Sequence, residues 1–257
     1  MNTDQSRLLS HFEDMANRAY ERGIPCASDF LNLNEQSLFH GAGKQFGFCQ
    51  IREDGGHPSA ERKRIFFFPP DYPAEAAEDY IQEQITCLSI TPVQAKFADS
   101  LTHRDFLGAV LNLGIDRSRV GDIFVQEQTS AWCLLDSRIG AFVCDNLTRV
   151  KHTTVHTELS GSLPEDFVIP TESRKGSVAS LRIDALIALA FKLSRTQASE
   201  CIREERVFLQ GKLVRSGAET VKPGQIVSLR GQGRFRFEKI LGETKKERNF
   251  VEISIFR

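Results

Sequence analysis

The sequence has few glycines and prolines, no long apolar run and no cysteine pair of the CxxC type. Its 257 residues include 18 Gly and 9 Pro, and 40% of them are hydrophobic; this composition excludes disordered, collagen-like and low-complexity chains. The longest uncharged apolar run covers residues 185–191, far short of the ~20 residues that span a bilayer. The first residues are polar and lack an apolar signal segment, so we expect a cytoplasmic protein that does not enter a membrane.

Six cysteines are scattered through the chain, and none is near a second one in sequence. This spacing is not typical of a disulfide framework or a structural zinc site, so reduced and buried thiols are expected. His152 and His156 have a spacing that suits metal ligation on a helix, but they lie in a β-patterned run without a nearby Cys or paired carboxylate. We therefore predict no metal, no cofactor and no catalytic residue.

A net charge of -1 conceals a strong asymmetry along the chain. Residues 174–257 contain 18 Lys and Arg against 9 Asp and Glu, a net charge of +9, whereas residues 1–173 carry a net charge of -10. A basic C-terminal segment on an acidic body favours binding to nucleic acid or another acidic surface, because Lys and Arg release condensed counterions from phosphates. A solvated basic face without a partner is the alternative.

The length suggests two domains or three small ones. Residues 1–75 are predicted to form an N-terminal α/β domain, with a helix around 8–19, a second short helix, and a strand pair over 46–51 and 64–68. In residues 76–160 the hydrophobic period alternates in the order strand, helix, strand, strand, helix, strand. That order is typical of the ferredoxin-like βαββαβ fold, which RNA-recognition (RRM) domains share with many unrelated proteins.

Residues 161–177 are rich in Gly, Pro, Ser and charge and are predicted to be a linker. In residues 178–257 one apolar helix precedes a second, which Ser194 and Gln197 open as a capping box. On this second helix Arg195, Ser199 and Arg203 share a face. Short strands follow around a Gln210–Gly211 turn and a Pro223–Gly224 turn, so we expect a helix pair on a small sheet, and an α+β fold class overall.

The C-terminal segments resemble the S-four domain of small-subunit ribosomal protein four, which is the alpha-L RNA-binding motif. The segments that carry this resemblance are 182–184, 194–198, 202–203, 207–212 and 221–230. The whole chain is also similar to the YlmH family of bacterial proteins, through segments 101–117, 120–123, 177–184 and 230–235. Two positions depart from the S-four pattern: Glu205–Arg206 stand where a Gly is usual, and Gln210 replaces the Asn of an Asn-Gly turn.

The resemblance implies a non-catalytic protein that binds structured RNA, either ribosomal RNA or tRNA. It also implies an association with ribosomal particles, in particular the large subunit, in translation, ribosome assembly or the handling of stalled ribosomes, and a plastid stromal location if the source is a plant. A monomer is expected. The phosphate contacts are predicted for Arg182, Arg195, Arg203 and Lys212, and polar contacts to sugar or base edges for Ser194, Gln197 and Gln210. Asp184 is interpreted as orienting Arg182 or capping within the helix pair.

Two alternatives remain at this point. The first is an RNA-modifying enzyme, of pseudouridine synthase or methyltransferase type, in which the S-four domain only delivers substrate; a buried carboxylate or thiol with a strongly perturbed pKa in a cleft of residues 76–160 would favour it. The second is an assembly factor whose acidic half binds a protein, which a large exposed apolar patch in that half would favour.

Overall fold

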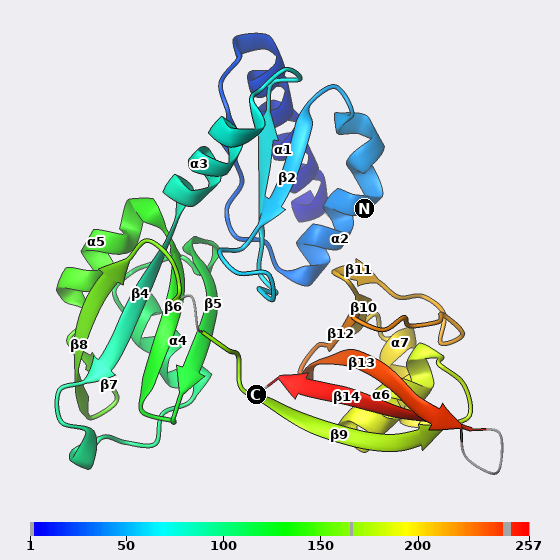
Figure 1. The fold of residues 1–257 in the computed structure, drawn as a ribbon. Coiled ribbons are helices and arrows are strands. Elements are labelled where there is room, and N and C mark those ends of the chain that lie inside the picture. The colour runs from blue at the N-terminus through cyan, green and yellow to red at the C-terminus, as the bar shows by residue number, and fades with distance from the viewer. Residues whose placement is uncertain (1–2, 165–166, 244–247, 257) are drawn as a thin grey trace. The chain divides into compact units, whose positions relative to one another are not determined.

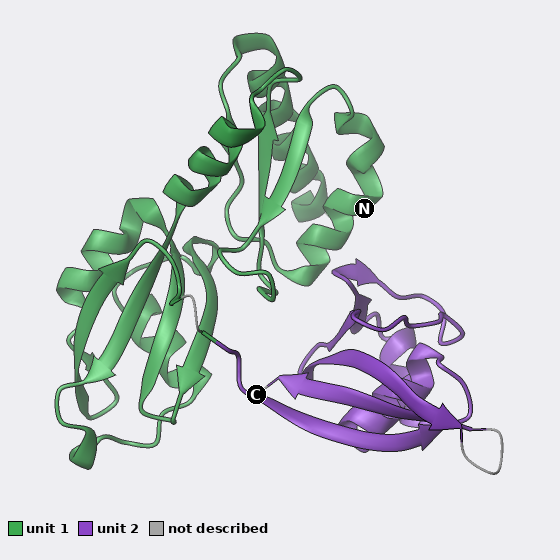
Figure 2. Cartoon of the chain, in the orientation of Figure 1, with its two compact units in different colours: residues 1–167 green, residues 168–257 purple. Residues whose placement is uncertain are grey.

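The computed structural model describes residues 3–164, 167–243 and 248–256, and it has the mixed α+β architecture that the sequence predicts. The chain divides into two compact units, residues 1–167 (unit 1) and residues 168–257 (unit 2) (Figure 2). Among the described residues, unit 1 contains two separate sheets and unit 2 one sheet with the helices α6 and α7, whose arrangement can be followed in Figure 1.

The N-terminal part of unit 1 is a small sheet of order β1-β3-β2 covered by two helices. Its core is unusually aromatic, because Phe12, Phe39, Phe46 and Phe67 contact one another at ring-centroid distances of 5.2–6.5 Å. A capping box of Asn32 and Glu35 starts the second helix. The elements are α1 (Thr3–Arg22), β1 (Cys26–Ala27), α2 (Leu33–Ala42), η1 (Gly43–Phe46), β2 (Gln50–Asp54) and β3 (Arg64–Phe68).

The predicted strand over 46–51 is wrong in its first half. Phe46 lies in η1 and is 1% exposed, and the strand begins only at Gln50. Phe46 turns into the aromatic core and Phe48 contacts Tyr20 edge-to-face at 5.3 Å. Burial of aromatic rings against α1 therefore determines the local backbone, more than the alternation seen in the sequence.

The second part of unit 1 has the predicted βαββαβ order. Its sheet has the order β5-β6-β4-β8-β7, and α4 and α5 share a core with one face of it through Phe106, Val110 and Val143. The elements are α3 (Ala74–Gln84), β4 (Ile85–Pro92), η2 (Ala95–Phe97), α4 (His103–Leu111), η3 (Arg117–Arg119), β5 (Val120–Gln126), β6 (Ser130–Asp136), α5 (Ser137–Asn146), β7 (Arg149–Val150) and β8 (Thr153–Ser160).

A buried ion cluster joins the two sheets of unit 1. The Arg64 guanidinium of β3 lies 3.8 Å from the Asp136 carboxylate at the end of β6, and both side chains are 1% exposed. Arg64 also donates to the carbonyls of Ser28 and Gln84, at 2.7 and 2.6 Å. Asp136 accepts further hydrogen bonds from Arg119 and Arg138, so the cluster satisfies its buried charges on both sides of the junction.

Unit 2 is a six-stranded sheet of order β11-β10-β12-β13-β14-β9 with two helices on one face. Its core combines Leu186 and Ile187 of the first helix and Ala198 and Ile202 of the second with inward residues of the strands. The elements are β9 (Thr171–Val178), α6 (Ile183–Phe191), α7 (Arg195–Arg203), β10 (Val207–Leu209), β11 (Lys212–Leu213), β12 (Ile226–Leu229), β13 (Gly233–Glu243) and β14 (Asn249–Phe256).

The linker predicted over 161–177 is contradicted by β9. Residues 171–177 form an edge strand that pairs antiparallel with β14 along its whole length. Polar side chains occupy both faces of β9, so it has no apolar alternation; Arg174, for example, donates to the Ala190 carbonyl and pairs with Glu172. This strand forms through backbone pairing with β14. The periodicity of apolar residues in the sequence could therefore not predict it. The separation of unit 1 into domains 1–75 and 76–160 stays a prediction.

Candidate nucleic-acid interface

The helix pair of unit 2 presents the predicted RNA-binding residues. Lys192, with a φ of 54°, caps α6 in the left-handed conformation, and α7 starts three residues later. The predicted capping box is present: the Gln197 amide donates to Ser194 Oγ at 3.1 Å, and the Ser194 amide donates to Gln197 Oε1 at 2.8 Å. This tight turn fixes the direction in which the first turn of α7 points its side chains.

Asp184 holds two arginines together at this turn. Its side chain is 5% exposed and accepts from Arg182 Nη2 at 3.0 Å and from Arg195 Nη2 at 2.8 Å. Burial would raise the pKa of Asp184, but the hydrogen bonds from Arg195 and Arg182 outweigh it, and the pKa is lowered. One buried carboxylate thus anchors two half-exposed guanidiniums side by side, as expected for Asp184 and Arg182 from the sequence.

The basic face of α7 continues away from this anchor. Arg195, Ser199 and Arg203 are exposed and spaced four residues apart along the helix. The Arg203 side chain is 77% exposed and pairs with Glu200 at 2.8 Å. An exposed pair of this kind is weak, so Arg203 can exchange Glu200 for a phosphate at little cost.

The other predicted contacts differ in their setting. Ser194 and Gln197 use one polar atom each in the capping box. Gln210 and Lys212 lie in the hairpin of β10 and β11, where Lys212 is exposed. Gln210 and Gly211 both have positive φ, 50° and 77°, and Gln210 Oε1 accepts from the Ile226 amide at 2.6 Å. The structure therefore gives Gln210 a role within the hairpin and brings Arg182, Ser194, Arg195 and Gln197 together around one turn.

Sequence reasoning missed two arginines on the sheet of unit 2. Arg234 and Arg236 alternate with the buried Phe235 and Phe237 on β13. A strict period of two was the available signal, since it places all cations of the segment on one face and all its aromatic rings on the other. Both arginines lie over the ring of Phe256 on β14.

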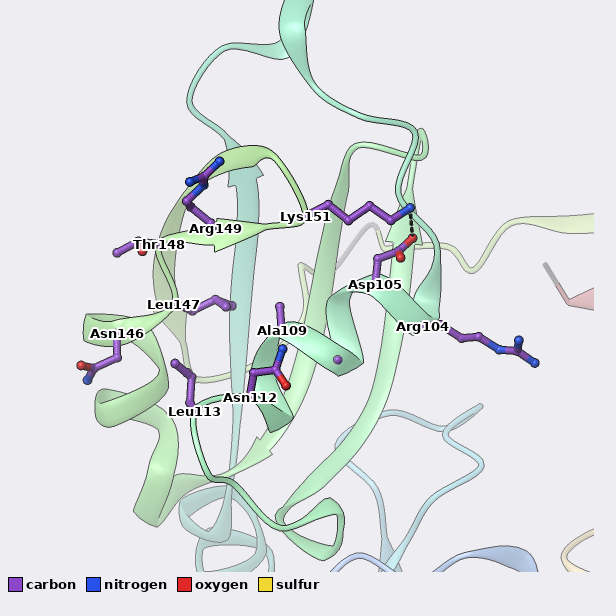
Figure 3. Close-up of a pocket in the computed structure, with 11 residues that line it drawn as sticks. Arg104, Asp105, Ala109, Asn112, Leu113, Asn146, Leu147, Thr148, Arg149 and Lys151 are labelled. Atoms are coloured by element: carbon purple, nitrogen blue, oxygen red, sulfur yellow. Dashed lines mark ion pairs between the residues drawn. The ribbon is translucent and has the colours of Figure 1, made fainter.

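Unit 1 has a pocket of about 490 Å³ between α4 and the segment that joins α5 to β7 (Figure 3). Figure 3 shows Lys151 directed toward Asp105 across its rim, at 2.9 Å, while Arg104 points away. The pKa of Asp105 is lowered to about 2, first by the hydrogen bond from Thr102 and next by that from Lys151. The Lys151–Asp105 ion pair and two arginines, Arg104 and Arg149, are thus among the residues that line the pocket, and the Arg104 side chain extends away from it.

Comparison with known proteins decides the family. Residues 78–161, which include the pocket, match the family model described as the putative RNA-binding domain in YlmH. The chain is 30% identical over 227 residues to the "Ribosome-associated protein quality control protein P2" of Bacillus subtilis, an alignment that covers 86% of this chain and 83% of the relative. The chain belongs to the YlmH family. The predicted resemblance is thereby confirmed.

A solved YlmH-family structure is also similar. The "Cell division protein ylmH from Streptococcus pneumoniae" is 22% identical, covers 62% of this chain and 93% of its own, and superposes with a TM-score of 0.49. The names of the two YlmH-family relatives refer to different processes, and each name concerns that protein alone.

In unit 1 of this YlmH-family chain, two buried thiols and the pocket carboxylate Asp105 have shifted pKa values. Burial raises the pKa of the Cys87 thiol to about 12 and also raises that of Cys133, and both thiols lie inside the sheet layer. Asp105 stays ionised down to about pH 2. Among the described residues no group of His, Cys, Asp and Glu could hold a metal ion, and no described helix is long and apolar enough to cross a membrane.

Proposed function

We propose that the protein binds structured RNA, either ribosomal RNA or tRNA, as a monomer and without catalysing a reaction, through the face formed by the start of α6 and by α7. The observation that carries this proposal is the pair of guanidiniums that Asp184 anchors at the helix turn. An anchored arginine loses less conformational entropy on binding a phosphate than a free one does. Arg182, Arg195, Arg203 and Lys212 would bind phosphates, and Ser194, Gln197 and Gln210 would contact sugars or base edges through their remaining polar atoms.

Family membership supports RNA binding by this chain, and the matched family model covers residues 78–161 of unit 1 rather than the face formed by α6 and α7. The matched model is described as an RNA-binding domain, and the Bacillus subtilis relative is named for ribosome-associated protein quality control. We further propose that this protein acts on ribosomal particles, with the large subunit as its partner in the quality control of stalled translation. Such a role requires recognition of folded RNA rather than chemistry.

A charge-reversal experiment tests the proposed face. Arg195→Glu with Arg203→Glu should weaken binding to ribosomal RNA by well over tenfold in a filter-binding assay, because two phosphate contacts are replaced by repulsion. The matched control is Arg18→Glu with Arg22→Glu, two exposed arginines of α1, which changes the net charge equally and should alter affinity little.

Thermal unfolding of both variants shows whether the fold is intact. Because Arg195→Glu brings a carboxylate toward Asp184, Arg203→Glu alone serves as a second variant that leaves the anchor untouched. An affinity for ribosomal RNA that is unchanged in the folded double variant, or reduced equally by the control on α1, would contradict this placement of the interface. Crosslinking in cells followed by sequencing of the attached RNA identifies the ribosomal or transfer RNA involved.

A further inference from the structure

The sheet of unit 2 has a second polar face, on the side away from α6 and α7. Phe235 and Phe237 of β13 and Val251 and Ile253 of β14 are fully buried in the core that both helices share. The alternate positions on these strands must therefore lie on the opposite face of the sheet. These outward positions include Arg234 and Arg236 on β13, Ser254 and Phe256 on β14, and Thr171, Ser173 and Lys175 on β9.

At one end of this outer face two guanidiniums and one aromatic ring come together. The guanidinium carbon of Arg234 lies 4.7 Å from the ring centroid of Phe256, and that of Arg236 lies 5.4 Å from it. The neighbours at outward positions come from three strands: Ser254 pairs with Arg236 and with Ser173, Thr171 pairs with Phe256, and on β12 Ser228 pairs with Arg234 and Ile226 with Arg236. The ring and the two planar cations therefore have three hydroxyl side chains, Thr171, Ser228 and Ser254, and one apolar side chain, Ile226, as their pairing neighbours.

The other end of the same face has a different electrostatic character. Lys175 and Lys239 lie 3.5 and 3.7 Å from the carboxylate of Glu252, which sits between them. The hydrogen bond from Ser173 and the two lysines lower the pKa of Glu252, so the carboxylate stays charged there. At the lysine end one carboxylate thus lies between two cations, whereas at the arginine end two cations lie over one aromatic ring.

We propose that Arg234, Arg236 and Phe256 form a second RNA-binding surface, which takes an unpaired nucleotide of single-stranded RNA on the outer face of the sheet of unit 2. A base would stack on the ring or on one guanidinium plane, and the other guanidinium would pair with the adjacent phosphate. Aromatic rings flanked by cations on an open sheet are the usual platform for unpaired bases, and arginine planes stack on bases as rings do. The inference rests on the proposed RNA-binding function and adds a separate site to it.

Two competing roles for this cluster lead to different experimental results. If the arginines only stabilise the end of the sheet through cation–π contacts, their removal changes stability and leaves RNA binding alone. If the surface binds an acidic protein segment, its removal weakens binding of an acidic peptide and not of RNA. Positive charge together with a stackable ring favours RNA, because carboxylate peptides need the charge alone.

The test uses the full chain and an unstructured ten-nucleotide oligouridylate, with binding followed by fluorescence anisotropy. Arg234→Ala with Arg236→Ala, and separately Phe256→Leu, should each weaken oligouridylate binding at least fivefold, whereas Phe256→Tyr, which keeps a stackable ring, should stay within twofold of the wild type. The matched control is Lys175→Ala with Lys239→Ala, which removes two charges from the same face and should reduce affinity less than twofold. Thermal unfolding identifies any variant that has lost its fold, and the Phe256→Tyr variant keeps the test valid if Phe256→Leu unfolds.

The outcomes separate this inference from the proposed function. In one outcome, Arg195→Glu with Arg203→Glu abolishes ribosomal RNA binding, and the folded Arg234→Ala with Arg236→Ala variant binds oligouridylate as the wild type does. This outcome would contradict the site on the outer face and support the proposed function of the helix face. If the arginine double variant and the lysine double variant lose the same amount of oligouridylate affinity, the attraction is general electrostatics and the proposed site is contradicted. Loss of polyglutamate binding with unchanged oligouridylate binding would assign the surface to protein. If the wild type binds neither RNA, the proposed function itself fails.

Discussion

At the residue scale, Asp136 is the side chain on which the junction of unit 1 depends most. It is buried at the start of α5, accepts a backbone hydrogen bond from Arg138 as the N-cap, and faces Arg64 across the junction of the two sheets. Burial alone would raise its pKa, but the hydrogen bond from Arg138, the charge of Arg64 and the hydrogen bond from Arg119 bring the pKa well below the ordinary value. The buried arginine requires this charge, because an unpaired guanidinium is costly inside a protein.

Asp136→Asn should lower the free energy of unfolding of unit 1 by about 3–5 kcal/mol, the usual cost of removing one partner of a buried ion pair. Asparagine can still act as the N-cap of α5, so the loss of stability measures the contribution of the negative charge. Urea unfolding followed by the fluorescence of Trp132, the only tryptophan, measures unit 1 specifically. Asp145→Asn, an exposed change on the same helix, is the control, and a loss no larger than the control's would contradict this role of Asp136.

The same residue predicts a pH dependence. Since the folded pKa of Asp136 is depressed, its stabilisation is complete above the unfolded pKa of about 3.9 and is lost as the pH falls through the folded pKa. The wild type should therefore lose stability below about pH 4 more steeply than Asp136→Asn. Urea unfolding at pH 7 and at pH 3 should show the difference between the two proteins becoming smaller at the lower pH; a constant difference would assign the stabilisation to another group.

Glu205 is a strained position in the S-four pattern. Its φ of 54° explains why a glycine is usual there, because a left-handed residue with a Cβ costs about 1–2 kcal/mol. The free energy of local opening at the β10 amides should be about 0.5–1 kcal/mol higher in Glu205→Gly than in Glu205→Gln. This figure is the strain that glycine relieves minus the entropy that glycine loses on folding. Hydrogen exchange measures this opening. Both variants remove the negative charge of Glu205. If RNA affinity rises equally in the two variants, the increase comes from the lost charge and not from the relieved strain.

At the scale of elements, the sequence predicts those structures that contain their own signals. The capping box of Ser194 and Gln197 and the amphipathic face of α7 are local, and both are present. The βαββαβ order is also local, because each strand and helix has a regular period. The strand β9 and the Arg64–Asp136 junction have no such signal, since each depends on a partner far along the chain.

The strand β9 determines where unit 2 can be cut. A fragment of residues 168–257 keeps the whole of β9 and should show a cooperative thermal transition by far-ultraviolet circular dichroism. A fragment that begins at residue 176 loses five of the pairs with β14, those from Thr171 to Lys175, and should melt at a lower temperature. If both fragments melted at the same temperature, β9 would contribute nothing to unit 2.

At the scale of the whole molecule, charge is divided between the two units. Residues 168–257 contain 18 Lys and Arg against 10 Asp and Glu, a net charge of +8, and residues 1–167 have a net charge of -9. The sequence alone reveals this division, because counting needs no structure. The geometry of the basic residues could not be predicted by counting, since Asp184 brings Arg182 and Arg195 together and the Arg234 and Arg236 side chains both lie over Phe256.

This division predicts the salt dependence of RNA binding. If about four to six cations of unit 2 contact phosphates, the logarithm of affinity should fall linearly with the logarithm of salt concentration, at a slope of roughly -3 to -5. Apolar association with a protein would give a slope near zero. Filter binding of ribosomal RNA at several salt concentrations measures the slope, and Arg195→Glu with Arg203→Glu should reduce its magnitude by about 2, because about one counterion is released for each phosphate contact.

The acidic unit should also act on selectivity. At low salt its charge repels any RNA, so the 168–257 fragment should bind unrelated duplex RNA more tightly than the full chain does, while the preference for ribosomal RNA should be smaller in the fragment. At high salt the difference in duplex binding should disappear, because screening shortens the repulsion to a few ångströms. Titration of both proteins with both RNAs at low and high salt tests this. A fragment that binds duplex RNA no more tightly than the full chain at low salt would mean that the acidic charge of unit 1 does not act on RNA bound to unit 2.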